Sequence, residues 1–398
     1  MEQHKEDINH SDRAHALLSA SGASKWTECT PSARLEEFFP EESSEFAEEG
    51  TLAHEVAEIF QKAELEIFDG SEATERMLPI KESEFYSEEL VDFVQTHVDY
   101  VLAQFTEAKR LCPGAILLIE EKVDLTHLIP ESFGTCDDII IADGVLEVID
   151  LKYGLGIPVK AENNKQLMLY ASGALEAFDL CYDIKTVRLT ISQPRLDSIS
   201  SWELPAVDLR VWGEEVLKPL AAIAFEGSGD QVTGDHCQFC KAAPRCRARA
   251  EEAKALISKK FADPRLLQDE EVLELYAISD NIGKWVKKLD AYVFNEAMNG
   301  KEWTGYKLVD GQNRRSWTDP NAVISALELD YSYDKIVNPG KVKGIGDIER
   351  LVGKNMFPSL LGDFVVSTRT SPKLVPDSDK RPRRGIEQAL EDYDDDIL

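Results

Sequence analysis

Apolar positions recur with helical spacing in the N-terminal part of the chain. One face of the helix expected over residues 43–68 carries the apolar residues Leu52, Val56, Ile59 and Phe60. Residues 87–110 repeat the same spacing of three and four. The pattern therefore predicts a mainly helical segment over residues 13–66 and a further helix over 87–110.

Short apolar runs then replace the helical spacing. Residues 115–128 and 186–195 read as strands, and 136–150 as a hairpin of two strands. Residues 162–178 read as a helix, and 198–204 as a partner for the last strand. The order of helix, three strands, helix and strand predicts an α/β fold with a mixed sheet.

The remaining chain is predicted to be mainly helical. Residues 1–262 form the first expected domain, and residues 263–370 form a helical C-terminal region in which 301–320 make a small hairpin. Residues 371–398 are rich in proline and charge, which is typical of a flexible acidic tail. The end of this tail, EDYDDDIL, resembles the C-terminal tip of bacterial single-stranded-DNA-binding proteins. That resemblance implies docking onto a host or phage recombination protein, and a solvated acidic terminus is the alternative.

Composition sets the class of protein. The chain has 398 residues, 43% of them hydrophobic, and no apolar run long enough to cross a membrane. Its N-terminus lacks the apolar segment of a signal peptide, so we expect a cytoplasmic protein of a cell or a virus-infected cell. The formal net charge of −30 argues against binding nucleic acid through a broad basic surface.

Charged side chains gather at one end of the predicted hairpin. Asp137 lies near the start of its first strand, and Asp150 and Lys152 lie at the end of its second. Because residues two apart on a strand share a face, Asp150 and Lys152 point to a spot that Asp137 can reach. Carboxylates can hold Mg²⁺, and a lysine beside them can orient a water for attack on a phosphodiester. Gly134 is expected to leave backbone room for a substrate.

Three more side chains extend this pattern. Gln166 and Tyr170 are four residues apart and share one face of the next helix. His54, at the start of an upstream helix, is a further candidate metal ligand. Taken singly, these features also fit a surface salt bridge, a polar helix edge and a capping or core histidine. Their order along the chain favours one metal site.

The combined pattern resembles the RecB-type branch of the PD-(D/E)xK nuclease superfamily. In that branch Gly-x-x-His, Gly-x-x-Asp, Asp-x-Lys and Gln-x-x-x-Tyr follow one another. The matching segments here are 50–54, 134–137, 150–152 and 166–170, although the first glycine lies four residues before the histidine instead of three. With ISQPR at 191–195, the pattern is most similar to phage and prophage members.

This resemblance implies a restriction-endonuclease-like core and a DNA nuclease that depends on Mg²⁺ or Mn²⁺. It assigns metal binding to His54, Asp137, Asp150 and the main-chain carbonyl of Leu151. It assigns action on water to Lys152, and positioning of the substrate or support of the lysine to Gln166 and Tyr170. An exonuclease of phage DNA recombination or processing is therefore expected. The alternatives are a catalytically inactive DNA- or protein-binding module with the same fold, and an unrelated structural protein of a virus particle.

Three of the seven cysteines are clustered. The spacing Cys237-x2-Cys240-x5-Cys246 is typical of a metal knuckle that needs a fourth ligand. Cys29 is the candidate fourth ligand, and His236 is an alternative if the metal is zinc. The AddB-like iron–sulfur branch of the same superfamily has one cysteine before its nuclease motifs and three after them. The resemblance therefore implies a [4Fe–4S] cluster, with Zn²⁺ as the alternative.

The other cysteines and the basic residues near the cluster carry weaker expectations. Three cysteines are predicted to be buried thiols: Cys112, Cys136 and Cys181. The densest basic group is formed by Lys241, Arg245, Arg247, Arg249, Lys259 and Lys260. It could contact nucleic acid, or it could be a solvated helix face paired with Glu251 and Glu252.

Overall fold

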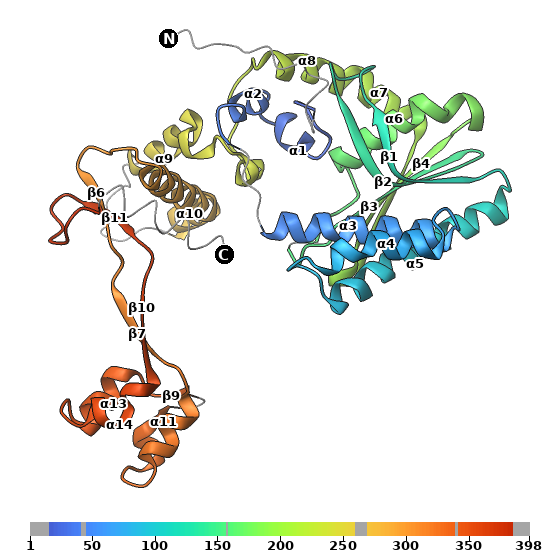
Figure 1. Ribbon diagram of the computed structural model, residues 1–398. Coiled ribbons are helices and arrows are strands. Elements are labelled where there is room, and N and C mark those ends of the chain that lie inside the picture. Colours follow the sequence, from blue (N-terminus) through green and yellow to red (C-terminus); the bar gives the residue numbers. More distant parts are fainter. Residues whose placement is uncertain (1–15, 41–44, 157, 259–268, 339–340, 385–398) are drawn as a thin grey trace. The chain divides into compact units, whose positions relative to one another are not determined.

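A five-stranded mixed sheet forms the centre of the first part of the chain (Figure 1). The computed structural model describes residues 16–40, 45–156, 158–258, 269–338 and 341–384. In spatial order the strands are β1 (Ile116–Asp124), β2 (Phe133–Ala142), β3 (Val145–Leu151), β4 (Thr186–Gln193) and β5 (Ser198–Pro205). Only β3 and β4 run parallel, and α6 (Lys165–Tyr182) connects them. The predicted α/β fold with a mixed sheet is confirmed.

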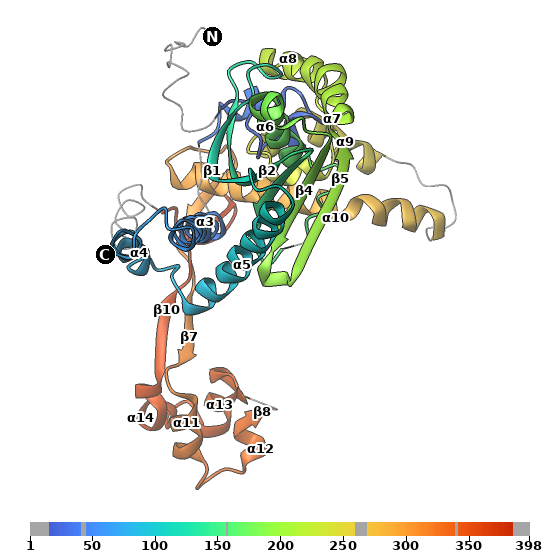
Figure 2. The ribbon, with the colours of Figure 1, turned by 90° about the vertical axis from the view of Figure 1, so that its right-hand side faces the viewer.

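Helices cover both faces of this sheet (Figure 2). One face packs on α6, and the other on α5 (Glu88–Leu111) and α3 (Glu45–Glu64). The stripe of α5 that faces the core carries Leu90, Val94, Val98, Val101 and Phe105. Strand β3 is enclosed from both sides, since its residues after Val145 are all buried. A short helix that the sequence did not predict, α4 (Gly70–Lys81), packs on α3.

The start of the chain lies against the segment that follows the sheet. Helix α1 (Ala23–Trp26) packs on α6, and α2 (Ser32–Glu36) packs on α8 (Lys218–Glu226). Between β5 and α8 lie α7 (Ala206–Trp212) and the π-helical turn η3 (Gly213–Leu217). After α8 come the 3-10 turns η4 (Asp235–Phe239) and η5 (Ala243–Arg245), then α9 (Arg247–Ser258) and α10 (Asp269–Met298).

The chain divides into two compact units, Met1–Trp285 and Val286–Leu398. The boundary lies inside α10, between Trp285 and Val286, whereas the prediction placed it at residue 262, which is outside the described residues. On the first unit's side, Trp285 Nε1 donates a hydrogen bond to the Ala243 carbonyl at 2.9 Å.

The second unit corrects two predictions. Residues 301–320 do not form a hairpin: β6 (Tyr306–Val309) pairs with β11 (Lys373–Pro376), and β7 (Asn313–Trp317) pairs with β10 (Val365–Arg369). Strand β11 also lies within the segment that was predicted as a flexible tail from residue 371. The end of that tail, residues 385–398, lies outside the described residues, and so does the predicted docking tip.

A small helical core explains this pairing. Between β7 and β10 the chain forms α11 (Pro320–Leu327), α12 (Tyr333–Ile336), α13 (Ile345–Val352) and α14 (Phe357–Leu361), with the two-residue strands β8 (Val337–Asn338) and β9 (Lys341–Val342). They enclose Val323, Leu327, Ile336, Ile348, Phe357 and Leu361. This core closes on itself, so the strands that enter and leave it lie beside each other.

Candidate metal centre and cysteine pocket

One imidazole and two carboxylates lie within reach of a single cation. His54 Nδ1 is 3.4 Å from Asp137 Oδ1 and 3.7 Å from Glu120 Oε1, and ligand atoms of all three lie within 4.8 Å of one another. We call these three residues the metal cluster. His54 stands well inside α3, which begins at Glu45, and not at a helix start as predicted. Glu120 was not predicted.

An irregularity in β1 and β2 turns the two carboxylates to the same place. On β1, Leu118 and Val123 both face the α6 side although they are five residues apart, so the alternation of side chains is broken between them. Glu120 has a left-handed φ of 51°. The pairs Ile119–Asp138 and Glu121–Cys136 flank the break and leave Glu120 opposite Asp137. The strands therefore bring together two carboxylates that repel each other unless a cation lies between them.

A proton on His54 supplies positive charge in the absence of a metal. Burial lowers the pKa of His54, but the carboxylate of Asp137 and a hydrogen bond to Glu120 outweigh burial and raise it to about 10. Burial raises the pKa of Asp137, but protonated His54 and then Lys152 hold it below its usual range. The pKa of Glu120 is raised by burial, although its hydrogen bond to His54 opposes that effect. A cation that replaces the proton would meet ionised ligands.

A second set of predicted residues forms a chain beside the cluster. Lys152 Nζ lies 2.8 Å from Asp150 Oδ2 and donates a hydrogen bond to Gln166 Oε1 at 3.0 Å. Gln166 Nε2 in turn donates to the Tyr170 hydroxyl at 3.1 Å. We call these four residues the lysine chain. Burial raises the pKa of Asp150, and the positive charge of Lys152 opposes that rise. Asp150 is buried, so its negative charge is stabilised mainly by Lys152.

Leu151 connects the two sets. Its main-chain N–H donates to Asp137 Oδ2 at 2.7 Å, so one carboxylate oxygen of Asp137 is fixed by β3 while the other faces His54. The resemblance to RecB-type nucleases implies a different role for Leu151, as a metal ligand through its main-chain carbonyl. The hydrogen bond gives Leu151 an additional part in orienting Asp137.

Gly134 makes room for a side chain and not for a substrate, which corrects its predicted role. A Cβ at this position would lie 2.7 Å from Cε1 of Tyr170. The Tyr170 ring is 6% exposed and packs in the core on the α6 side of the sheet. The glycine before Asp137 therefore positions the last member of the lysine chain.

A cleft opens beside both sets. It has a volume of about 700 Å³, and the residues that line it include His54, Lys152 and the glycines 154 and 156 of the loop after β3. Gln193 holds that loop, since its Oε1 accepts a hydrogen bond from the Val159 N–H at 2.6 Å. A substrate in this cleft would lie against His54 and Lys152.

The residue after Asp137 faces the opposite way. Asp138 is fully buried, and its Oδ2 lies 3.1 Å from Nε2 of His97, which is 1% exposed on α5. Burial raises the pKa of Asp138, and the bond to His97 opposes that rise. This pair was also not predicted. It ties β2 to α5 directly behind the metal cluster.

The four predicted cysteine ligands line one small pocket. Cys29 comes from the turn before α2, and Cys237, Cys240 and Cys246 come from the segment around η4 and η5. Burial raises the pKa of Cys29, and the neighbouring sulfurs of Cys246 and Cys237 raise it further. His236 also lines the pocket, but its Nε2 lies 3.0 Å from the Val232 carbonyl. Cys29 is therefore the better fourth partner for the three clustered thiols.

The pocket is stabilised by polar contacts that the sequence did not reveal. Lys25 Nζ lies 2.6 Å from Glu36 Oε2, and Glu36 Oε1 accepts a hydrogen bond from the Lys241 N–H at 2.8 Å. Burial and Glu36 raise the pKa of Cys240 to about 12. A group that binds this sulfur as a thiolate must supply positive charge of its own.

Two of the three cysteines predicted to be buried thiols are not buried. Cys181 is exposed and Cys112 only half-buried, because both lie at the ends of helices, whereas Cys136 is buried as expected.

Arg249 does not belong to a basic surface, since its side chain is 3% exposed, binds Glu252 at 2.9 Å and donates to the Asn281 carbonyl at 2.6 Å. Lys259 and Lys260 lie outside the described residues.

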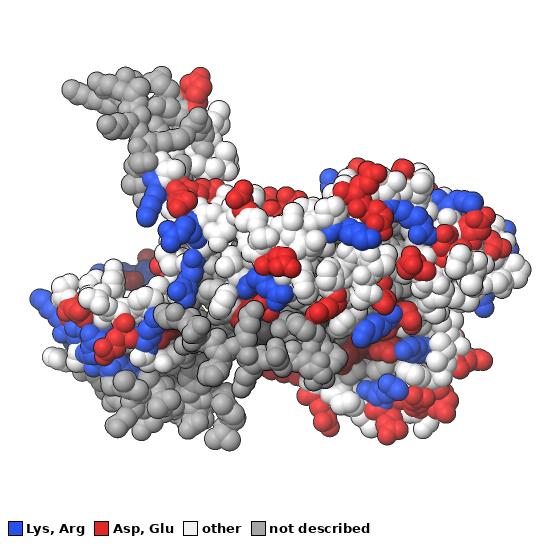
Figure 3. All heavy atoms as spheres, turned by 90° about the horizontal axis from the view of Figure 1, so that it is seen from above, with Lys and Arg blue, Asp and Glu red and all other residues white. Residues whose placement is uncertain are grey.

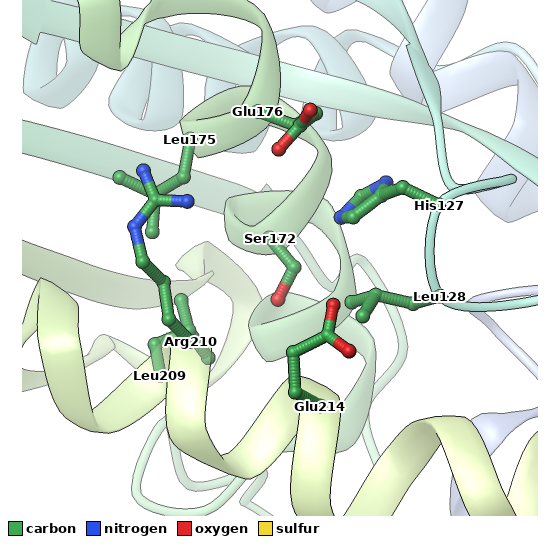
Figure 4. A pocket seen from close by; sticks show the side chains of 8 residues that line it. All are labelled: His127, Leu128, Ser172, Leu175, Glu176, Leu209, Arg210 and Glu214. Atoms are coloured by element: carbon green, nitrogen blue, oxygen red, sulfur yellow. The ribbon is translucent and has the colours of Figure 1, made fainter.

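A separate pocket of about 130 Å³ lies between α6, α7, η3 and the loop after β1. Figure 4 shows the side chains of His127, Ser172 and Glu214 directed toward the same space. The pKa of His127 is lowered by burial, and Glu176 opposes this. This pocket shares no residue with the metal cluster or the lysine chain.

In the described part of the chain, no helix is both long and apolar enough to cross a membrane.

Comparison with known proteins places the chain in a family. The chain is similar to a solved structure described as "Crystal structure of SSO0001", and the alignment covers 55% of this chain and 95% of the other. The sequence identity is 14% and the TM-score is 0.23, which is too low to carry an argument. The model of the family described as "Protein of unknown function (DUF2800)" matches residues 15–382. Since this match spans most of the sequence, the chain belongs to the DUF2800 family.

Proposed function

We propose that this protein is a DNA nuclease that depends on Mg²⁺ or Mn²⁺ and has a RecB-type, restriction-endonuclease-like core. One observation carries the proposal: the metal cluster and the lysine chain lie at one end of β2 and β3, joined by the bond from Leu151 to Asp137 and open to one cleft. Residues from five elements, α3, β1, β2, β3 and α6, are thereby combined in one site.

The donor atoms fit a hard divalent cation. His54, Glu120 and Asp137 would hold it, and Asp150 stands close enough that its charge raises the pKa of His54. When bound, such a cation neutralises charge on the phosphate and lowers the pKa of a bound water. Two carboxylates brought together by the irregularity in β1 and β2 are otherwise an unfavourable arrangement.

Lys152 is the residue that acts on the attacking water in this proposal. Its ammonium group is fixed between Asp150 and Gln166, which leaves it little rotational freedom. Gln166 is fixed in turn by Tyr170. A lysine held in this way can donate a hydrogen bond to a water, or to the scissile phosphate, from a constant position.

The cysteine pocket fits a group that takes four thiolates, and we propose a [4Fe–4S] cluster there, with Zn²⁺ as the alternative. Cys29 belongs to the start of the chain, and the other three belong to the segment after α8. Such a group would join the two ends of the nuclease domain.

A catalytically inactive module with the same fold is the second candidate. The observation that favours it is the net charge of −30. On the face in Figure 3, acidic and basic side chains alternate in small groups and form no broad basic surface among the residues described there. Such a protein would bind DNA or another protein without cutting it.

A cleavage assay separates the two candidates. End-labelled linear and circular DNA, single- and double-stranded, are incubated with Mg²⁺ or Mn²⁺ and wild-type protein, Lys152→Ala or the exposed control Lys185→Ala. We expect the wild type and the control to cleave, and Lys152→Ala to be slower by about 10²–10⁴-fold with an unchanged far-ultraviolet spectrum. A wild type that cuts none of these substrates would favour the inactive module.

A further inference from the structure

The two residues between Cys237 and Cys240 form part of the wall of the cleft. Gln238 and Phe239 line it together with His54 and Lys152, although they belong to the segment that builds the cysteine pocket. Phe239 is 69% exposed and lies in the wall of the cleft, so its ring is accessible to a bound molecule. The cysteine segment therefore contributes directly to the space in which the substrate would lie.

The main chain at Phe239 is anchored while its ring is left free. Lys25 Nζ donates to the Phe239 carbonyl at 3.5 Å and also binds Glu36. The N–H of Lys241, two residues further on, donates to the other oxygen of Glu36. With Cys237 and Cys240 on either side, the backbone has little freedom, so an exposed ring is presented at a fixed place.

The rest of the cleft offers few contacts for phosphates. Among the described residues that line it, Lys152 is the single lysine or arginine, and the facing loop presents Gly154 and Gly156. A Cβ at either glycine would meet nothing within 4 Å, so a flat group can approach the backbone there. In a chain of net charge −30, contact with bases is a better source of affinity than contact with the phosphate backbone.

We propose that Phe239 stacks on an unpaired base, and that the substrate of this cleft is single-stranded DNA or a single-stranded end. This inference rests on the nuclease function proposed above. An aromatic ring stacks on any base, so it recognises the unpaired strand without reading its sequence. A base pair hides both faces of its bases inside the duplex, so a duplex cannot use the ring in this way.

The test compares Phe239→Ala with Phe239→Trp and with Tyr276→Ala, a control residue that is 77% exposed and does not line the cleft. We expect Phe239→Ala to lower kcat/KM on single-stranded DNA by about 5- to 150-fold and to leave the slower cleavage of blunt duplex unchanged. Phe239→Trp should retain wild-type rates, and the control should change nothing. Equal rates for Phe239→Ala and wild type on single-stranded DNA would overturn the proposal.

A binding experiment gives a readout that does not depend on cleavage. Single-stranded oligonucleotides with 2-aminopurine at successive positions are titrated with each variant in EDTA. Stacking on Phe239 should quench one position in the wild type and not in Phe239→Ala. If quenching depends on Phe239 but the wild type cuts no DNA, the nuclease function fails and the stacking site stands. If the wild type cuts but no position is quenched, the nuclease stands and the stacking site fails.

Discussion

The three carboxylates of the candidate metal site, Glu120, Asp137 and Asp150, stand on strands of the central sheet. The clustered cysteines stand on the 3-10 turns η4 and η5 or directly after them. Asp150 is paired with Ile191 in the ladder between β3 and β4. Asp137 lies between the paired residues Cys136 and Asp138 of β2, and the Leu151 N–H holds its carboxylate. The cysteine segment is joined to the start of the chain by single contacts, such as Lys25 Nζ to the Phe239 carbonyl and the Lys241 N–H to Glu36 Oε1.

This difference indicates what each site needs in order to keep its shape. A site on buried strands is held in place by the fold and keeps its geometry without a bound cation. Short turns have little stability of their own, so their geometry depends on side-chain contacts or on bonds to a metal. Four substitutions test that contrast, and the one with the largest expected effect comes first.

Cys29→Ala should lower the free energy of unfolding by more than about 4 kcal/mol, because it removes one of the four ligands of the proposed group in the cysteine pocket. Urea denaturation of protein purified without oxygen measures this loss. Hydrogen exchange should show the loss first in residues 228–246. The exposed Cys181→Ala is the control, with an expected change below about 0.5 kcal/mol. Similar stability in the two variants would mean that the turns of the cysteine segment keep their structure without a bound group.

Asp138→Ala should cost about 3–5 kcal/mol, since it leaves His97 buried without its carboxylate. The strand-held site would then be shown to depend on the contact behind it, and not on a metal. The exposed Asp143→Ala controls for the loss of an aspartate from the same hairpin. The contrast between the two sites fails if addition of Mg²⁺ restores the stability of Asp138→Ala.

Gly134→Ala should cost about 1–3 kcal/mol and should also reduce cleavage, because the new methyl group displaces the Tyr170 ring and with it Gln166. Thermal unfolding and the cleavage assay measure the two effects. Gly114→Ala is the matched control, since a Cβ at Gly114 meets nothing within 4 Å. A stable Gly134→Ala protein with full activity would show that Tyr170 is not needed by Lys152.

Much of this architecture follows from simple spacing in the sequence. Asp150 and Lys152 lie on one side because they are two residues apart at the end of a strand, and Gln166 and Tyr170 because they are four apart on a helix. The cysteine spacing likewise predicted a cluster of three thiols, the resemblance favoured Cys29 as the fourth, and all four line one pocket. These rules hold where the backbone is regular.

The missed residues lie where regularity ends or where partners are distant in sequence. Glu120 and Glu121 are adjacent on β1. The alternation of side chains along a strand does not predict which of them faces the site, because the left-handed φ of Glu120 breaks that alternation. Asp138 was not predicted, because its partner His97 comes from a distant helix that was predicted only from its apolar spacing. The strand pairs of the second unit form across the inserted helical core, and no local turn signal marks them.

The smallest effect, at most about 1.4 kcal/mol per pH unit, concerns the proton on His54. Its pKa in the folded protein, about 10, is raised above the ordinary value of 6.5, so the stability that this charge contributes is present below pH 6.5 and is lost as the pH rises through 10. A cation must displace this proton. The affinity for Mn²⁺, measured by calorimetry, should therefore increase by up to about tenfold per pH unit between pH 6.5 and 9. In His54→Asn the affinity should be lower and the slope should flatten, because no proton is displaced at that position. An equal slope in both proteins would assign the proton to Glu120 or Asp150, and would mean that His54 does not occupy the cation's place.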